Sequence, residues 1–176
     1  PKNQFFFEKF GRSFAELHLY SHNSFGFTED NWIGSTPQKN IATLTQKTDW
    51  TTFYFEKRLL FQYQQLERQG HVTSQLKSCF RSLESIVDKI LDGSKESPSL
   101  LHGDLWGGNY LVDSDSNPCI IDPAVYYGHR EADLAMTKLF GGFSDGFYQA
   151  YQEVFTLQDG YEYRENIYLL YHVMNH

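Results

Sequence analysis

The feature that most constrains this chain is a glycine-rich segment, Leu101–Asn109 (LHGDLWGGN), which carries acidic and amide side chains at fixed spacing. Three of its nine residues are glycine, which opposes a regular helix or strand and predicts a loop. Two strand-like runs follow at 110–112 and 119–121, joined by a polar turn. This pattern predicts a β-hairpin, and Asp122 comes directly after it. A small rigid hairpin would therefore hold Asp122 near the loop.

Asp104, Asn109 and Asp122 are the side chains with a chemical interpretation. Phosphoryl transfer from a nucleotide needs a carboxylate that orients and accepts the hydroxyl proton, and hard oxygen ligands that hold magnesium. The plainer interpretation is that Asp and Asn cap turns in a glycine-rich loop. The order His-x-Asp, four residues, Asn, hairpin, Asp matches the catalytic loop and metal-binding aspartate of kinases. The match favours the chemical interpretation.

The likeness extends to a particular family. The runs that resemble the fructosamine kinase (ketosamine-3-kinase) family are His102–Asn109, Ile121–Ala124 and Tyr127–Met136. Upstream segments that also resemble the family are 15–18 (AELH), 25–27, 30–31 and 33–38 (IGSTPQ), so the likeness covers nearly the whole chain. Trp106, after His-Gly-Asp-Leu, distinguishes the sequence from aminoglycoside phosphotransferases and choline kinases, to which that family is similar in fold.

The resemblance implies an α+β, mainly helical fold, namely the large C-terminal lobe of a protein-kinase-like, aminoglycoside phosphotransferase-like fold with a short β-hairpin. Residues 1–176 would form the catalytic and substrate-binding lobe. The N-terminal nucleotide-binding lobe is not expected within this sequence, because there is no G-x-G-x-x-G and no strand-borne Lys before Phe5. The missing initiator Met and the apolar-periodic run that ends at His176 indicate a piece of a longer protein. Alone, this piece is expected to be inactive.

The resemblance also implies an activity. It is the ATP-dependent phosphorylation of the 3-hydroxyl of sugar-amine adducts, small or protein-bound, with Mg²⁺ as cofactor. The phosphorylated adduct would then fall apart and free the amine, so the role would be protein deglycation. Carried onto this sequence, Asp104 would be the catalytic base, and Asn109 and Asp122 would hold the metal.

Five further residues complete the candidate site. Trp106, two residues after the base, would offer a platform to a sugar's apolar face, or else it packs under the loop. Asp30 and Asn31 lie in a polar and aromatic segment that could bind a polyhydroxylated ligand or could close the core. His102 is expected to order the loop. Asp133, at a helix start, is interpreted as scaffold that caps N–H groups or clamps the loop backbone.

Apolar periodicity predicts helices over about residues 10–20, 49–69, 74–91, 131–139, 144–155 and from 162 onward. Gly70 is expected to cap the second helix, the third is expected to end at 92–93, and these two helices are expected to pair antiparallel. The segment 24–48 reads as a long ordered loop without regular structure. Arg130 and Glu131 are interpreted as solvated helix-end charges.

Charge and composition exclude several classes of partner. With 15 basic and 22 acidic residues, the net charge is −7, which disfavours nucleic-acid binding. No apolar stretch approaches the roughly 18 to 20 residues of a membrane span, and the start lacks a secretory signal. Cys79 and Cys119 form no C-x-x-C pair, as is typical of a reducing compartment. We predict a cytoplasmic protein whose partner is a small molecule or another protein.

Two rival functions remain at the level of sequence. One is another small-molecule kinase of the same fold, acting on an aminoglycoside, choline or a plain sugar. The other is a non-catalytic kinase-like domain that binds ligands or partners. The presence of Asp104, Asn109 and Asp122 together opposes the second, and Trp106 opposes the first.

Overall fold

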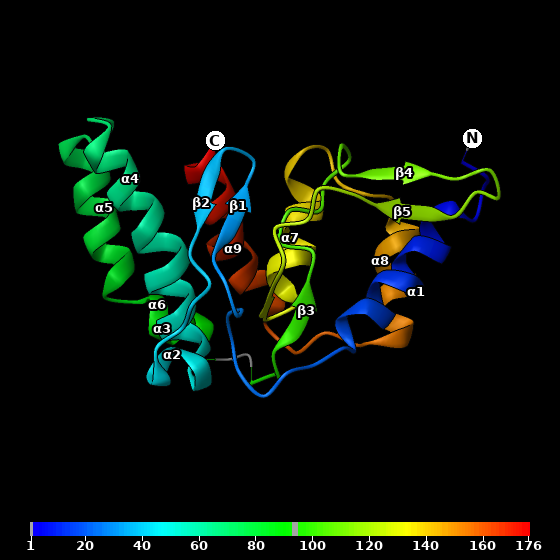
Figure 1. The fold of residues 1–176 in the computed structure, drawn as a ribbon, viewed down its shortest axis with the longest axis horizontal. Helices are drawn as coiled ribbons and strands as arrows, with labels where there is room; N and C mark the ends of the chain where they lie inside the picture. The colour runs from blue at the N-terminus through cyan, green and yellow to red at the C-terminus, as the bar shows by residue number, and fades with distance from the viewer. Residues whose placement is uncertain (1, 93–94) are drawn as a thin grey trace.

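The computed structural model describes residues 2–92 and 95–176, and within these ranges it is mainly helical with three small sheets (Figure 1). The helices are α1 Phe6–His18, α2 Leu44–Thr48, α3 Trp50–Tyr54, the π-helical η1 Phe55–Leu60, α4 Phe61–Arg68, α5 Ser74–Glu84, α6 Val87–Leu91, α7 Glu131–Leu139, α8 Asp145–Val154 and α9 Tyr161–Asn175. The strands are β1 Asn31–Ile33, β2 Thr36–Gln38, β3 Ser99–Leu101, β4 Tyr110–Val112, β5 Pro118–Ile120 and β6 Tyr126–Gly128. They pair antiparallel as β1–β2, β3–β6 and β4–β5.

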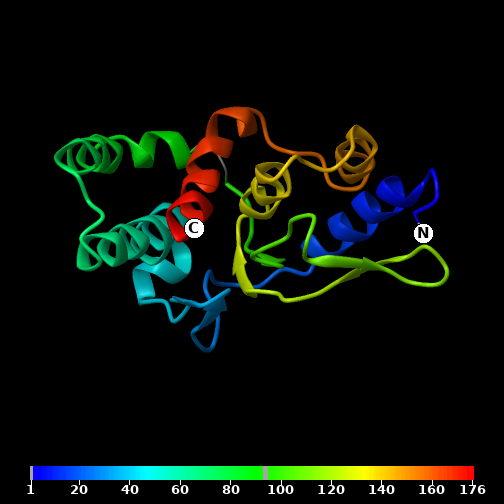
Figure 2. The same cartoon turned by 90° about the horizontal axis from the view of Figure 1, so that it is seen from above.

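Two hydrophobic clusters hold the lobe together, and α7 lies between them. One cluster gathers side chains of α3, η1, α6 and α9, and the other joins α1 to α8. Figures 1 and 2 show these two groups toward opposite ends of the long axis. Helix α7 gives Ala132 and Ala135 to the first cluster and Leu134 to the second. Because residues three apart share a helix face, its two sides serve the two clusters.

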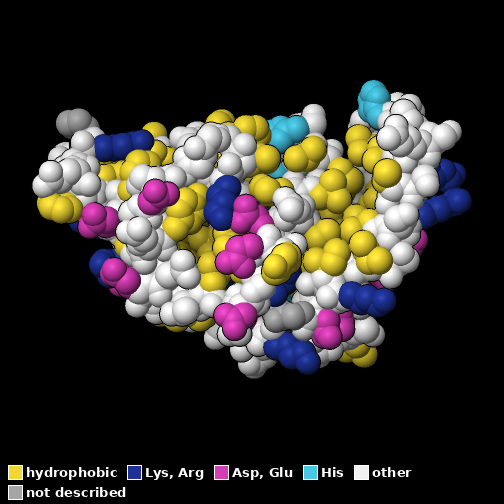
Figure 3. Space-filling view, turned by 180° about the vertical axis from the view of Figure 1, so that it is seen from behind, with side chains coloured by type: hydrophobic (Ala, Val, Ile, Leu, Met, Phe, Trp, Pro, Cys, Tyr) yellow, Lys and Arg dark blue, Asp and Glu magenta, His cyan; other side chains and the backbone are white. Residues whose placement is uncertain are grey.

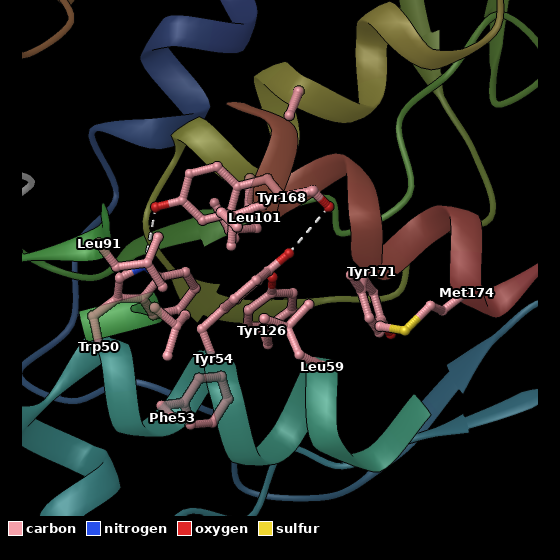
Figure 4. Packing of buried hydrophobic residues seen from close by; sticks show 14 of the residues in the cluster. Trp50, Phe53, Tyr54, Leu59, Leu91, Leu101, Tyr126, Tyr168, Tyr171 and Met174 are labelled. Carbon is pink, nitrogen blue, oxygen red and sulfur yellow. Dashed lines mark hydrogen bonds between the residues drawn. The ribbon is translucent and has the colours of Figure 1, made fainter. Parts of the chain in front are cut away.

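The centre of the first cluster is aromatic (Figure 4). The Trp50 Nε1 donates a hydrogen bond to the Tyr168 hydroxyl at 3.1 Å, and the Tyr54 hydroxyl donates to the Tyr168 carbonyl at 3.1 Å. Buried Trp and Tyr need partners for their polar ends, so these bonds let large rings fill the core without stranded polar atoms.

Most predicted helices are confirmed. The three C-terminal helices match α7, α8 and α9, and the prediction for 49–69 matches α3, η1 and α4, followed by Gly70 at φ 76°. Helix α1 begins at Phe6 rather than near residue 10, because Phe6 is buried and extends the apolar stripe. The rings of Tyr63 on α4 and Phe80 on α5 stack at 4.1 Å between centroids, as expected for paired helices.

The prediction of one long helix over 74–91 is wrong, since α5 ends at Glu84 and α6 begins at Val87. Ile86 has φ −126°, outside the helical region, and the Ser85 hydroxyl donates to the Ser82 carbonyl at 2.7 Å. Such a side-chain bond competes with helix propagation. Gly93, where that helix was predicted to end, lies outside the described residues.

The segment 24–48 was predicted to lack regular structure, and this is wrong because it contains β1, β2 and α2. The strands have three residues each and include Pro37, so they show no alternation that sequence could reveal. Gly34, at φ 56°, takes the turn between them. The prediction of an ordered segment is confirmed, since Phe25 and Ile33 are buried. Strand β6 was also missed.

Arg130 and Glu131 are not solvated charges, and that interpretation is wrong. Both are fully buried, and each forms an ion pair with a residue far away in sequence: Arg130 with Glu96 at 2.6 Å and Glu131 with Arg164 at 2.6 Å. A buried charge persists only when it is paired and hydrogen-bonded. These two pairs therefore tie the start of α7 to the segment before β3 and to α9.

The surface carries mixed charge. On the face shown in Figure 3, the described Lys and Arg side chains are interspersed with Asp and Glu. In residues 2–92 and 95–176, no helix is long and apolar enough to cross a membrane.

Candidate active site

The loop that follows β3 is anchored in both hydrophobic clusters. Leu101 belongs to the first cluster and Leu105 to the second, and both are buried. Gly103 lies between them at φ 83°, and a Cβ there would come within 2.1 Å of the Ala124 carbonyl oxygen. Only glycine fits such a conformation at such a close approach. The loop and the segment after the hairpin are therefore in direct backbone contact.

Asp104 and Asn109 are brought together within this loop. The Asn109 Nδ2 donates to the Asp104 carbonyl oxygen at 2.8 Å and to its carboxylate Oδ2 at 3.1 Å. The backbone N–H of Asn109 donates to the Trp106 carbonyl at 3.0 Å, which closes the turn. Since the amide nitrogen of Asn109 is directed at Asp104, its oxygen Oδ1 points away and is the atom suited to coordinate a cation.

The environment of Asp104 makes it a stronger base than an ordinary aspartate. Burial, together with the nearby carboxylates of Asp133 and Asp122, raises the pKa of Asp104 to about 6, although the bond from Asn109 opposes the shift. A general base works best with a pKa close to the operating pH. Asp104 can therefore accept a proton and still be ionised near neutrality.

Asp122 is exposed and has an unusual backbone conformation. Its φ is 52°, in the left-handed region that non-glycine residues seldom adopt and that is often found at functional sites. The preceding residue is fixed on both sides, because the Ile121 N–H donates to the Asn109 carbonyl at 3.0 Å and the Ile121 carbonyl accepts from His102 Nε2 at 2.9 Å. The hairpin and His102 thus direct the Asp122 carboxylate outward beside the loop.

Asp133 binds the loop backbone. Its Oδ2 accepts from the His102 N–H at 2.7 Å and its Oδ1 from the Gly103 N–H at 2.8 Å. Burial favours the neutral acid, but the bond from His18 and the nearby imidazoles lower the pKa of Asp133 below its ordinary value. A charged acceptor makes stronger bonds to N–H groups than a neutral one. Helix α7 thereby fixes the backbone of the loop through Asp133.

His18 was missed by the sequence analysis. Its Nε2 lies 3.2 Å from Asp133 Oδ2, and its Nδ1 lies 2.7 Å from the Tyr151 hydroxyl. Because a carboxylate can only accept, Nε2 donates to Asp133, and Nδ1 is hydrogen-bonded to the Tyr151 hydroxyl. These partners lie 115 and 133 residues away in sequence, so no local pattern could have revealed the contact.

Trp106 is half-buried at the edge of the loop. Its ring packs edge-on against Phe140 with 5.3 Å between centroids, and a Cβ on Gly108 would come within 2.4 Å of the indole. The ring therefore lies against its own loop and the end of α7, while part of it stays exposed. This geometry is compatible with both the platform and the packing interpretation.

Asp30 and Asn31 are engaged within the protein. Asp30 accepts from the Asn40 N–H at 2.7 Å and from the Lys39 ammonium at 2.8 Å. Burial opposes the effect, but these bonds lower the pKa of Asp30 to about 2. The Asn31 Nδ2 donates to the Val125 carbonyl at 2.8 Å. Both side chains order the chain around β1, and their contact with a substrate stays a prediction.

The donor set around the loop fits a magnesium ion that is shared with nucleotide phosphates. Among the described residues, no group of three or more His, Cys, Asp and Glu side chains is placed to hold a metal by itself. Magnesium is commonly held by only one or two carboxylates together with substrate phosphates and water. The Asp122 carboxylate and the Asn109 amide oxygen are hard oxygen ligands of that kind.

A pocket of about 550 Å³ lies elsewhere, lined by residues that include Trp50, Pro98 and His129. Pro98 precedes β3 and His129 follows β6, whereas the loop with Asp104 begins where β3 ends. The pocket and Asp104 are therefore at opposite ends of the β3–β6 pair, and the pocket is not part of the candidate site.

The helical lobe, the loop with its Asp and Asn, and the hairpin ending in Asp122 define the larger lobe of a kinase-like fold. The sequence profile described as fructosamine kinase matches residues 2–176. The chain belongs to the fructosamine kinase family.

Relatives and solved structures agree with this assignment. A probable ketoamine kinase of Vibrio parahaemolyticus is 41% identical over all of this chain and 57% of its own length. The chloroplastic protein-ribulosamine 3-kinase of Arabidopsis thaliana is 45% identical over 94% of this chain and 50% of its own. The crystal structure of a candidate fructosamine-3-kinase from Thermobifida fusca superposes with a TM-score of 0.90 at 36% identity, covering 100% of this chain and 59% of that one. This chain thus spans 50% to 59% of the length of these three proteins.

Proposed function

We propose that the protein of which this chain is the catalytic lobe transfers the γ-phosphoryl group of ATP to the 3-hydroxyl of sugar-amine adducts. The observation that carries the proposal is that Asp104, whose pKa is raised, is hydrogen-bonded to Asn109 within one loop, and that the exposed Asp122 lies beside this loop. Membership of the fructosamine kinase family favours a sugar attached to an amine, small or protein-bound, as the acceptor. Phosphorylation would destabilise the adduct and so reverse glycation of the amine.

Each residue has a definite role in this proposal. Asp104 would orient the acceptor hydroxyl and take its proton. Asn109 and Asp122 would hold Mg²⁺, which when bound neutralises charge on the nucleotide phosphates. His102 and Asp133 would keep the loop in place through their backbone contacts. The remaining nucleotide contacts would come from an N-terminal lobe, since the matched relatives are longer than this chain.

The pH dependence of the rate should report on Asp104. Its pKa is about 6 because of burial and the neighbouring carboxylates, and only the ionised form can accept a proton. We expect kcat/KM of the full-length protein to fall as pH drops below about 6 and to level off above it. A pH–rate profile measures this; a rate independent of pH between 5 and 7 would contradict Asp104 as the base.

The raised pKa of Asp104 also makes the folding stability depend on pH, in the direction opposite to that of the rate. A carboxyl whose pKa is raised on folding stabilises the protein fully below the ordinary Asp value of 3.8, and that contribution is lost as pH rises through about 6. Ionised Asp104 therefore favours chemistry at the expense of stability.

Trp106→Ala separates the platform interpretation from the packing interpretation. If the indole covers the C–H-rich face of the sugar, the variant should raise KM for a model fructosyl-amine and leave the nucleotide KM nearly unchanged. If Trp106 is packing, the variant should lose about 3 kcal/mol of stability and impair both substrates alike. Measuring the melting temperature beside both KM values decides between them.

A panel of acceptors tests the proposed activity against its rivals. The full-length protein would be supplied with ATP, Mg²⁺ and, in turn, a fructosyl-amine, a ribulosyl-amine, an aminoglycoside, choline and a plain sugar. We expect turnover with the sugar-amines and little with the others. Preference for any of the other three would replace the proposal, and no turnover with any acceptor would favour a non-catalytic domain.

The exposed, free Cys79 and Cys119 are compatible with the proposed cytoplasmic location.

A further inference from the structure

The β1–β2 hairpin contacts the backbone just after Asp122. Gln38, on β2, is buried, and its Nε2 donates to the Ala124 carbonyl at 2.8 Å. Asn31, on β1, donates from Nδ2 to the Val125 carbonyl at 2.8 Å. These two carbonyls belong to the second and third residues after Asp122. Two amide side chains of one hairpin therefore hold one end of the segment that carries the proposed metal ligand.

His102 holds the other end of that segment. Its Nε2 donates to the Ile121 carbonyl at 2.9 Å, and its carbonyl accepts from the Ala124 N–H at 2.8 Å. Asp122 thus lies between fixed neighbours, with a φ of 52°. A strained conformation persists only where the surrounding contacts over-determine it. Since the Ala124 N–H is bonded to His102 and the Ala124 carbonyl to Gln38, these two residues fix the two successive peptide groups that flank Ala124.

The orientation of the two amides is itself determined by buried donors. The Arg58 guanidinium, which can only donate, bonds the Asn40 Oδ1 at 2.8 Å, so the Asn40 Nδ2 is directed to the Asn31 Oδ1 at 2.9 Å. The Asn31 Nδ2 is then left facing the Val125 carbonyl. The Gln38 Nε2 also donates to Asn31 Oδ1 at 2.9 Å. Arg58 and Asn40 are both fully buried, so this order of donors and acceptors is protected from water.

We propose that Gln38 and Asn31 are positioning residues for Asp122. They fix the backbone from which the Asp122 carboxylate reaches the metal, and they act through that backbone and do not touch the ion. The inference rests on the proposed metal role of Asp122, and it gives the β1–β2 hairpin a function in the metal site in place of substrate contact by Asn31.

The alternative is that the amides only stabilise the hairpin, and a substitution at Gln38 separates the two. Gln38→Met keeps the length of the side chain and removes both donors. In the full-length protein, we expect the affinity for Mn²⁺ in the presence of ATP to fall by about 10-fold to 100-fold, the range for partners that orient a metal ligand. Electron paramagnetic resonance of free Mn²⁺ measures this without turnover. The Mg²⁺ concentration for half-maximal activity should rise by a similar factor.

Two control variants are matched to this change. Tyr171→Phe removes the bond that the Tyr171 hydroxyl donates to Gln38 Oε1 at 2.9 Å, and leaves both Nε2 bonds in place. Thr73→Ala removes the N-cap of α5, far along the chain from the hairpin, where Thr73 Oγ1 accepts from the Leu76 N–H at 3.1 Å. Both should lower the melting temperature and leave Mn²⁺ affinity unchanged.

A double-mutant cycle gives the decisive result. If Gln38 acts through Asp122, adding Gln38→Met to Asp122→Ala should cause no further loss of Mn²⁺ affinity. Additive losses, or unchanged Mn²⁺ affinity in folded Gln38→Met, would overturn the inference. If Gln38→Met does not fold, Asn31→Leu, which spares the Gln38 bond to Ala124, decides by the same measurements. Absence of sugar-amine turnover in the wild type would reject the proposed function and still leave the Mn²⁺ results to decide this inference.

Discussion

Replacing Asp104 with Asn in the full-length protein is expected to lower kcat by about 10² to 10⁴-fold, the range for loss of a positioned general base. The variant keeps the shape of the side chain and removes its capacity to take a proton. The KM for the sugar-amine should change little, because the substitution removes an interaction of the transition state. Steady-state kinetics with a fructosyl-amine measures both constants, and near-normal turnover would contradict the assignment.

The stability of the same variant provides its control. Ionised Asp104 is unfavourable in its partly buried site, as its raised pKa of about 6 indicates. Above that pH, Asp104→Asn should therefore melt no lower than the wild type, since the uncharged amide does not meet this penalty. Loss of rate together with retained stability separates catalysis from folding. A strong drop in melting temperature would indicate a structural role.

Replacing Asp122 with Ala is expected to remove metal-dependent nucleotide binding and activity together. An ion that stabilises transferring phosphates contributes several kcal/mol to the transition state, so the rate should fall on the order of 10³-fold. Titrating Mg²⁺ and ATP against the variant by calorimetry measures the binding. Loss of both nucleotide binding and activity is expected if Asp122 is a metal ligand, whereas unchanged nucleotide binding would indicate that Asp122 has a structural role.

Asp115→Ala is the matched control for this change. Asp115 is an exposed residue in the turn of the β4–β5 hairpin, between β4 and β5 and away from the loop of Asp104. Its removal alters the net charge by the same amount. We expect Asp115→Ala to keep both Mg²⁺ dependence and rate, so that any loss in Asp122→Ala reports on position and not on charge.

The sequence could predict those parts of the fold that local patterns encode. The apolar stripe of α5 and the apolar periodicity of α7, α8 and α9 are local patterns. The glycines of residues 101–109 likewise predict a loop. The strands β1 and β2 could not be predicted, because three residues with Pro37 give no periodic signal. The contact of this hairpin with the segment after Asp122 is made by Gln38 and Ala124, which are 86 residues apart in the sequence.

The candidate site divides in the same way. Asp104 and Asn109 lie five residues apart, and their contact follows from spacing along one loop. The contact of Asp133 with the loop backbone agrees with its interpretation as scaffold, whereas its contact with His18, 115 residues away, could not be predicted. The burial of Arg130 was missed for the same reason, since its carboxylate partner Glu96 is 34 residues away. Long-range pairing of charges leaves no trace in local sequence.

The most direct test of the central claim is the position of the phosphate in the product. Full-length protein would be incubated with ATP, Mg²⁺ and fructosyl-lysine, and the product examined by phosphorus-31 NMR with proton correlation. We predict a phosphate ester on the oxygen of carbon 3, followed by decay of the adduct and release of free lysine, with neither signal in the Asp104→Asn variant. A phosphate on another hydroxyl, or no transfer to the sugar-amine while a different acceptor is phosphorylated, would contradict the account.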